Sequence, residues 1–215
     1  MENMENMEKF KAPLSFRVIF VLNEIIFWLF SLVVVLAVVF AMLVFIGVFK
    51  EDMQLHVNLP VAFDTEEVGF IMTNNTPSNA QLVEAYGKLH LIDTPLHLTR
   101  LFMIPLLLVT GIMFFLLFIF RKFIRNVRRG KVFEIGNIKL LKILAIGLLS
   151  FWMFWRTYDW IVGVMLEKRL HFGTIEVSTD TQGHNALLIS ALVLWVLSHI
   201  FIQGRKLQEE ASLTI

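Results

Sequence analysis

The sequence predicts a mainly helical membrane protein: a bundle of four transmembrane helices with a small extracytoplasmic β-sheet. Of the 215 residues, 57% are hydrophobic and only 17% are charged, whereas about 25% of the residues of a soluble domain are charged. A soluble core of this length could not hide so much apolar surface, so the composition indicates a membrane protein. The chain has no cysteine, which excludes disulfides and thiolate metal sites.

Four apolar segments have the length that a membrane span needs, or come close to it. The hydrocarbon core of a bilayer is about 30 Å thick and takes about 20 helical residues. The segments are 25–49, 101–120, 143–161 and 186–203. Each is too continuously apolar for the amphipathic helix of a soluble protein. The first is longer than the core of a signal peptide (about 7–15 residues) and no A-x-A site follows it, so we expect it to be retained.

Lysine and arginine are shared unequally between the segments outside these spans. Thirteen of them lie in 1–24, 121–142 and 204–215, with eight in 121–142 alone, whereas 50–100 and 162–185 together carry five. The positive-inside rule therefore predicts that both termini are cytoplasmic. Residues 1–24 are then a cytoplasmic tail and interfacial segment, and 204–215 a cytoplasmic tail.

The two segments predicted to lie outside, 50–100 and 162–185, show strand patterns. Apolar and polar side chains alternate between residues 53 and 59, as in a half-buried strand. Weaker strand candidates follow at 68–73, 85–92 and 170–177. We expect a small sheet of three or four strands at the outer ends of the helices.

Residues 121–142 are predicted to form a basic cytoplasmic hairpin. The helix of the second span is expected to run on to Arg129, and Gly130 to end it in the left-handed conformation. Asn137 is the expected N-cap of the next helix. The stretch 121–131 would attract anionic lipid or an acidic partner. Because this stretch adjoins the membrane and lacks a known nucleic-acid-recognition motif, no direct nucleic-acid binding is expected.

Several ionisable residues are candidates for chemistry within or near the membrane. Arg156 and Asp159 lie one turn apart and would form an outer polar layer, either as a structural pair near the headgroups, which we favour, or as a functional site. Glu24 is expected to be interfacial, with a proton or cation site as the alternative. His199, near the inner end of the fourth span, is expected to make a helix–helix hydrogen bond rather than to relay protons.

The other five histidines fall in the outer segments: His56, His90, His97, His171 and His184. No pair has H-x-H or H-x₃-H spacing, so we expect a solvated polar face, with a zinc or pH-sensing site as the alternative. The sequence contains no nucleophile–base motif, Walker loop or Rossmann fingerprint. We therefore expect neither a catalytic site nor a cofactor.

Two stretches on the predicted cytoplasmic side carry a family resemblance. One is the basic turn, Arg125 to Phe133 continuing through Asn137, and the other is the C-terminus from Gly204. They resemble a bacterial four-span membrane family termed domain of unknown function 2975, which has a "basic, Gly, x, x, Phe … Asn" turn and ends in "G…L…acidic…LT-V/I". The residues that match these motifs are Arg125, Arg128, Arg129, Gly130, Phe133, Asn137, Gly204, Leu207, Leu213 and Thr214. The resemblance covers nearly the whole chain.

The resemblance implies a multi-pass protein of the bacterial inner membrane with no established reaction. Many members are encoded beside a small helix-turn-helix regulator, which suggests a cytoplasmic partner. We predict a non-enzymatic protein that docks such a regulator through 121–142 and 204–215, in contact with membrane lipids and with a second copy of the chain as a further candidate partner. One alternative is a small transport or ligand-sensing protein with a site between the outer sheet and the helices. Another is that both motifs only fold and orient the helices.

Overall fold

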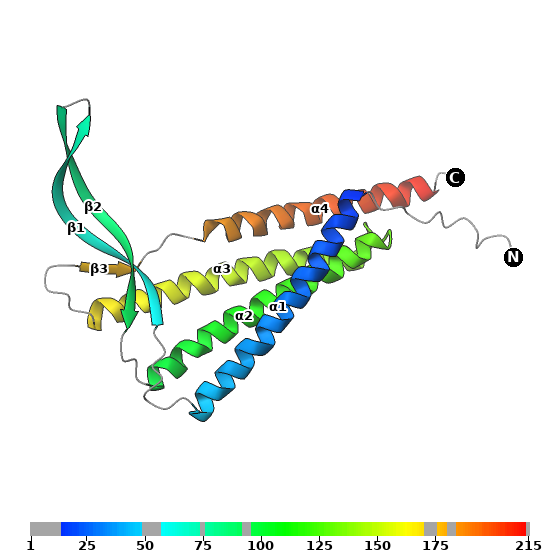
Figure 1. Ribbon diagram of the computed structural model, residues 1–215. Helices are drawn as coiled ribbons and strands as arrows, with labels where there is room; N and C mark the ends of the chain where they lie inside the picture. Colours follow the sequence, from blue (N-terminus) through cyan, green and yellow to red (C-terminus); the bar gives the residue numbers. More distant parts are fainter. Residues whose placement is uncertain are drawn as a thin grey trace. The chain divides into compact units, whose positions relative to one another are not determined.

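The computed structural model describes residues 14–48, 57–73, 76–91, 96–169, 176–179 and 184–213. The elements follow in the order α1 (Leu14–Ile46), β1 (Val57–Thr73), β2 (Thr76–Leu91), α2 (Leu96–Arg128), α3 (Ile135–Arg169), β3 (Glu176–Thr179) and α4 (Asn185–Leu213) (Figure 1). They form two compact units. The first unit contains Met1–Ile46, Phe102–Trp152 and Asn185–Ile215, and the second contains Gly47–Leu101 and Met153–His184.

Among the described residues, four helical segments are long and apolar enough to cross a membrane: Leu14–Ile46, Leu96–Arg128, Ile135–Val164 and Asn185–Leu213. The prediction of four helices with the length and composition of membrane spans is confirmed. Most of the helices run past the predicted apolar segments, because a helix continues into polar sequence wherever its backbone hydrogen bonds can continue. Helix α1 also begins before the predicted segment 25–49, at Leu14, and Phe49, the predicted end of that segment, lies outside the described residues. Gly47 has a φ of 79°, and this left-handed residue ends α1 at Ile46.

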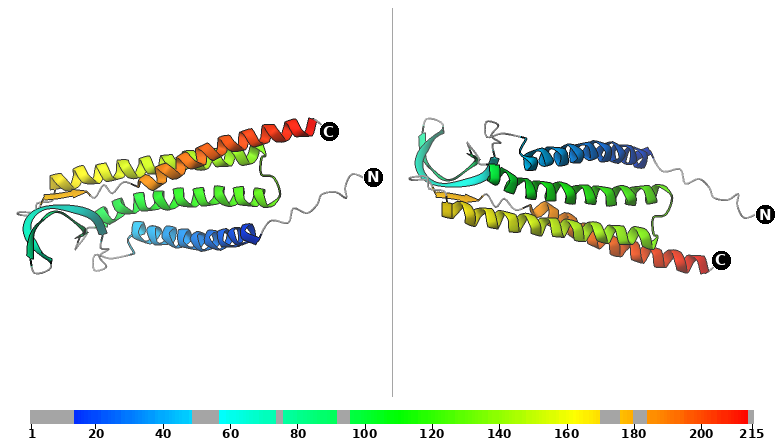
Figure 2. Two further views of the ribbon diagram at one scale, coloured as in Figure 1. Left: turned by 90° about the horizontal axis from the view of Figure 1, so that it is seen from above. Right: turned by 90° about the horizontal axis from the view of Figure 1, so that it is seen from below.

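In the first unit, the start of α1, the α2–α3 turn and the last turns of α4 lie at the same end (Figures 1 and 2). We call this the turn end. Helix α1 packs on α2 through Phe27, whose ring stacks on Phe114 at 5.5 Å between centroids. Helices α2 and α3 share a buried core of Leu116, Ile119, Leu140 and Leu144, and Leu194 of α4 packs against it.

The second unit contains a three-stranded antiparallel sheet in the order β2-β1-β3. Strands β1 and β2 pair as a hairpin from Val57 opposite Leu91 to Thr73 opposite Thr76. Strand β3 pairs with β1 from Val61 to Asp64.

Two of the predicted strands, at 53–59 and 68–73, fall on the single strand β1. The register shifts between Asp64 and Glu67, and such a bulge lets one strand continue through an irregular stretch. The patterns at 85–92 and 170–177 overlap β2 and β3. Residues 53–56, 92 and 170–175 lie outside the described part of the chain.

Candidate interaction surface at the turn end

Helix α2 ends in a Schellman motif built on Gly130. The N–H of Gly130 donates to the carbonyl of Val127 at 3.0 Å, and the N–H of Lys131 donates to the carbonyl of Asn126 at 3.1 Å. Gly130 has a φ of 79°, which glycine adopts without the steric penalty of a Cβ. The prediction that Gly130 ends the helix in the left-handed conformation is confirmed. Helix α3 begins only five residues later, so the turn is short.

Asn137 does not cap α3, and this prediction is wrong. The N–H groups of Asn137 and Ile138 donate to the carbonyl of Glu134 at 3.0 and 3.2 Å, so Glu134 occupies the cap position. The fully buried Asn137 side chain turns back instead: its Nδ2 donates to the carbonyl of Lys131 at 2.6 Å, and its Oδ1 accepts from Asn126 Nδ2 at 2.9 Å. The carbonyl of Lys131 accepts a hydrogen bond, and the Asn137 Nδ2 group can donate one, whereas the side-chain oxygen that an N-cap uses can only accept. Asn137 therefore holds the turn against both helices.

The turn contacts the end of α4 through Phe133. Its ring lies edge-on to that of Phe201 at 5.4 Å, and Phe123 of α2 lies 6.3 Å from the same Phe201 ring. A Cβ on Gly204 would stand 2.7 Å from a carbon of the Phe133 ring, closer than carbon atoms can approach. A Cβ at position 204 would therefore force the Phe133 ring to shift. The two predicted motifs, far apart in sequence, meet here.

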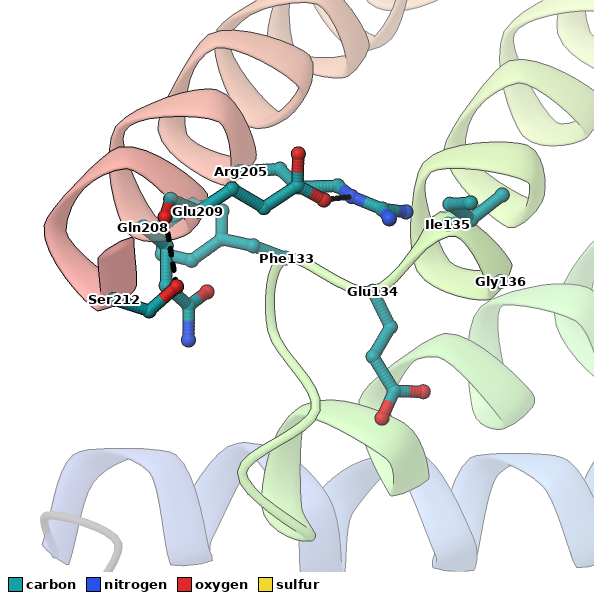
Figure 3. A pocket seen from close by; sticks show the side chains of 8 residues that line it. All are labelled: Phe133, Glu134, Ile135, Gly136, Arg205, Gln208, Glu209 and Ser212. Atoms are coloured by element: carbon teal, nitrogen blue, oxygen red, sulfur yellow. Dashed lines mark hydrogen bonds and ion pairs between the residues drawn. The ribbon is translucent and has the colours of Figure 1, made fainter.

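The turn and α4 together line an open pocket of about 480 Å³ (Figure 3). Its lining comes from both motifs: Phe133, Glu134, Ile135, Gly136, Arg205, Gln208, Glu209 and Ser212. The four α4 residues have the spacing i, i+3, i+4, i+7 and therefore share one helix face. Arg205 Nε donates to Glu209 Oε1 at 2.6 Å along that face. We call residues 133–136 together with 205–213 the turn–α4 surface.

Three apolar side chains of the turn–α4 surface are exposed. Ile135 is 51% exposed, Leu207 is 66% exposed and Leu213 is 87% exposed. Leu207 and Leu213 belong to the predicted C-terminal motif, and Thr214 lies outside the described residues. The turn–α4 surface therefore combines a hollow with apolar side chains that remain exposed among the described residues.

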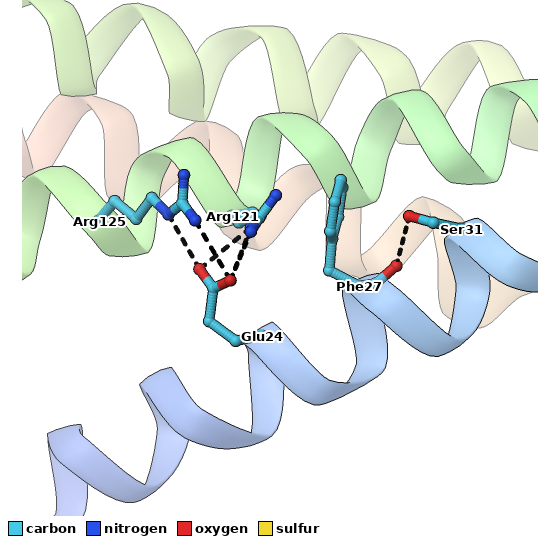
Figure 4. Close-up of polar contacts among 5 residues, drawn as sticks. All are labelled: Glu24, Phe27, Ser31, Arg121 and Arg125. Atoms are coloured by element: carbon cyan, nitrogen blue, oxygen red, sulfur yellow. Dashed lines mark hydrogen bonds and ion pairs between the residues drawn. The ribbon is translucent and has the colours of Figure 1, made fainter.

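Two arginines of the basic motif have a different neighbour, helix α1 (Figure 4). Glu24 Oε1 accepts from Arg121 Nε at 3.0 Å and from Arg125 Nε at 2.9 Å, and Oε2 accepts from Nη2 of both arginines at 2.5 and 3.2 Å. The Arg121 side chain is only 11% exposed, and its guanidinium carbon lies 3.9 Å from the centroid of the Phe27 ring. This is a charge-assisted, bidentate contact reinforced by a cation–π interaction. Arg128 makes a second cation–π contact with α1: its guanidinium carbon lies 4.2 Å from the centroid of the Phe20 ring.

This ion pair is not predicted from the sequence, from which Glu24 is expected to be interfacial, with a proton or cation site as the alternative. Glu24 lies well inside α1, and its partners are 97 and 101 residues away in sequence. The signal that could have found them is the i, i+4 spacing of Arg121 and Arg125, which puts two cations on one helix face.

The structure divides the predicted interaction motif. Gly130, Phe133, Asn137 and Gly204 are brought together by the turn, Arg125 and Arg128 contact α1, and Arg129 is exposed beside Gly130.

The predicted outer polar layer belongs to the second unit. Arg156 and Asp159 lie on α3, where Arg156 is exposed and Asp159 is half-buried, and their pairing stays a prediction. His184 stacks on Trp155 with 5.0 Å between ring centroids, while His199, in the first unit, lies edge-on to Trp195. Among the residues that the structure describes, no group of three or more histidine, aspartate or glutamate residues could hold a metal ion.

Comparison with curated proteins and with solved structures finds no match. A family profile matches residues 56–215, a range that takes in most of the chain, the second to fourth spans and both motifs. The resemblance seen in the sequence is confirmed by this match. The chain belongs to the family described as "Protein of unknown function (DUF2975)".

Proposed function

We propose that this chain is a non-enzymatic protein of the bacterial inner membrane that docks a cytoplasmic protein on its turn–α4 surface. In this topology the turn end is cytoplasmic and the β-sheet is extracytoplasmic. The unequal distribution of lysine and arginine supports the orientation. The common position of the start of α1, the α2–α3 turn and the end of α4 in the first unit agrees with it.

The observation that carries the docking proposal is the contact between Phe133 and Gly204. It joins the two least generic stretches of the sequence into one surface with a pocket of about 480 Å³, within the range of about 300–1,000 Å³ that binding pockets occupy. If the motifs served only to orient the helices, nothing would require them to enclose a pocket together.

The length of α4 supports a role outside the bilayer. The helix has 29 residues, whereas about 20 suffice to cross the hydrocarbon core. The remaining roughly nine residues project beyond the apolar span, and they include the exposed Leu207 and Leu213. A contiguous apolar patch that a protein exposes to water commonly marks a protein contact.

Charge indicates what kind of partner fits. The acidic residues of the pocket are already engaged, Glu134 with Lys131 and Glu209 with Arg205, and the neighbouring sequence is basic. We therefore propose that the partner presents an acidic segment with at least one apolar anchor, which would pack against Phe133 and Ile135. The helix-turn-helix regulator suggested by the family resemblance is the first candidate.

Site-specific crosslinking in native membranes tests the proposal. A photoreactive residue replaces Gln208, inside the pocket, or Leu14, an exposed apolar residue at the start of α1 that serves as the matched control. The proposal expects one cytoplasmic protein to crosslink from position 208 and not from position 14. Ile135→Glu should reduce that product by roughly tenfold or more, because it removes an apolar anchor and adds a charge that repels the acidic segment.

Two results would contradict docking. One is an identical set of products from positions 208 and 14. The other is a partner yield per folded chain that Ile135→Glu and Leu213→Glu leave unchanged. A loss of chain abundance with no change in any crosslinked product would instead indicate that the motifs serve folding alone.

A further inference from the structure

The contact between Glu24 and Arg121 lies where two helices change from apolar to charged sequence. The apolar segment 25–49 begins directly after Glu24, and the segment 101–120 ends directly before Arg121. Because these two side chains are hydrogen-bonded, the two boundaries lie at the same height. In a bilayer, the height at which an apolar span ends is the boundary between hydrocarbon and headgroups. Lipid phosphates lie at this level.

Positive charge exceeds negative charge at this boundary. Glu24 is the only acidic residue within 14–48 and 96–128. It faces both Arg121 and Arg125, and Arg128 follows on the same face of α2, because the spacing is i, i+4, i+7. The 4.2 Å contact of Arg128 with Phe20 shows that this face still meets α1 there. Arg17 lies two turns before Glu24 on the same face of α1.

The arginines differ in how accessible they are. Arg121 is almost buried and stacks on Phe27, so it serves as the internal anchor. The Arg125 side chain is 46% exposed, and Arg128 is exposed as well. A guanidinium carries five N–H donors, and the bonds to Glu24 involve only Nε and Nη2 of Arg125. Donors therefore remain for a second acceptor at the height of the headgroups.

We propose that Arg125 and Arg128, together with Arg17, bind the phosphate of one anionic phospholipid where α1 and α2 meet. Arginine suits this role because its planar fork matches two phosphate oxygens. The site is distinct from the turn–α4 surface and does not depend on the proposed docking function. It also differs from the general attraction of a basic segment to the membrane, because it is stoichiometric and depends on named arginines.

Lipid titration of the purified full-length chain in a neutral detergent tests the site. Native mass spectrometry counts the bound molecules of dioleoyl phosphatidylglycerol, of dioleoyl phosphatidylcholine and of soluble glycerol 3-phosphate. We expect one copy of phosphatidylglycerol to bind saturably and to raise the unfolding temperature, and neither of the other two probes to do so.

Matched variants separate the site from overall charge. Arg125→Gln/Arg128→Gln should weaken phosphatidylglycerol binding by roughly tenfold or more. Lys122→Gln/Lys139→Gln removes the same charge from two exposed lysines and should change the affinity by no more than about twofold. Arg128→Gln alone retains both arginine contacts of Glu24, so this variant should unfold like the wild type. It should still weaken lipid binding, because it removes one of the arginines assigned to the phosphate.

Three outcomes would overturn the proposal. Equal weakening by the lysine and arginine pairs would reduce it to surface charge. Glycerol 3-phosphate binding as tightly as phosphatidylglycerol would make the ligand a free phosphate ester rather than a lipid. Unchanged lipid affinity in Arg125→Gln/Arg128→Gln would leave these arginines without the assigned role.

Discussion

Two contacts hold the turn end of the first unit together, and their chemistry is opposite. Between α1 and α2, a carboxylate meets two guanidinium groups, one of them almost buried. Between the turn and α4, the Phe133 ring meets Gly204, and the Asn137 amide holds the turn in place. The first contact depends on charge and the second on shape.

The difference shows what each contact can be used for. The ion pair of Glu24 fixes the relative height of two helices, because a displaced carboxylate would leave Arg121 buried without its partner. The Phe133 contact leaves Ile135, Leu207 and Leu213 exposed nearby. The charged contact therefore fixes the position of α1 relative to α2, whereas the packed contact supports a surface that another molecule can cover.

Loss of the Glu24 carboxylate should have the largest effect of any single change at the turn end. Glu24→Ala leaves two arginines facing each other, and we expect a loss of about 3 kcal/mol in the free energy of unfolding, measured by titration with sodium dodecyl sulfate in mixed micelles. Glu134→Ala is the control, since its ion pair with Lys131 is exposed on both sides and should cost at most about 0.5 kcal/mol. Equal losses of unfolding free energy for the two variants would show that the Glu24 contact stabilises the chain no more than an exposed ion pair does.

Removal of the Asn137 amide should come next. Asn137→Ala leaves the turn carbonyl of Lys131 and the amide of Asn126 without their present partner, at an expected cost of about 2 kcal/mol. Hydrogen exchange should also become faster in the turn but not at the α1–α2 contact. Gln208→Ala, on the exposed face of α4, is the comparison variant. A turn that stays as protected as in the wild type would contradict the role given to this amide.

A matched pair of glycines isolates the contribution of shape. Both Gly204 and Gly111 lie inside helices, but a Cβ at 204 meets the Phe133 ring whereas a Cβ at 111 meets nothing within 4 Å. Gly204→Ala should destabilise the chain by about 1–2 kcal/mol, and Gly111→Ala should be neutral or stabilising by up to about 1 kcal/mol. The same detergent titration measures both. If the two substitutions had the same effect, the ring would be able to move aside without cost.

The smallest effect is expected for the exposed ion pair at the pocket. Arg205→Gln removes the i, i+4 partner of Glu209 and should cost no more than about 0.5 kcal/mol, with a difference that shrinks as salt is added. A loss above about 1 kcal/mol would mean that this pair supports the α4 extension rather than only lining the pocket.

The sequence predicts features that depend on local chemistry. Apolar runs identify the four spans, and a glycine after a basic helix end identifies the terminator at Gly130. The same local view fails where two local signals compete. Asn137 has the side chain of an N-cap, but the nearby carbonyl of Lys131 offers it a better use inside the turn. The apolar run 25–49 contains Gly47, whose left-handed backbone conformation ends α1 at Ile46.

Contacts between distant residues were beyond sequence reasoning. The i, i+4 spacing of Arg121 and Arg125 predicts a cationic helix face, but nothing in the neighbouring sequence identifies Glu24 as the partner of that face. Gly204 and Phe133 each stand in a recognisable motif, yet their contact depends on how α4 crosses the turn. Which motif residues share a surface was therefore decided by packing.

The Glu24 contact also has a consequence for how the protein is made. Glu24 leaves the ribosome 97 residues before Arg121, so the first span enters the membrane while its partner is still unsynthesised. During that interval the carboxylate lacks its two cationic partners, which favours a shallow position of α1 that keeps Glu24 in contact with water. Arrival of the second span supplies the two arginines and fixes α1 in its final place. We therefore expect the helix pair to form in two stages, with insertion of α1 first and its docking on α2 second.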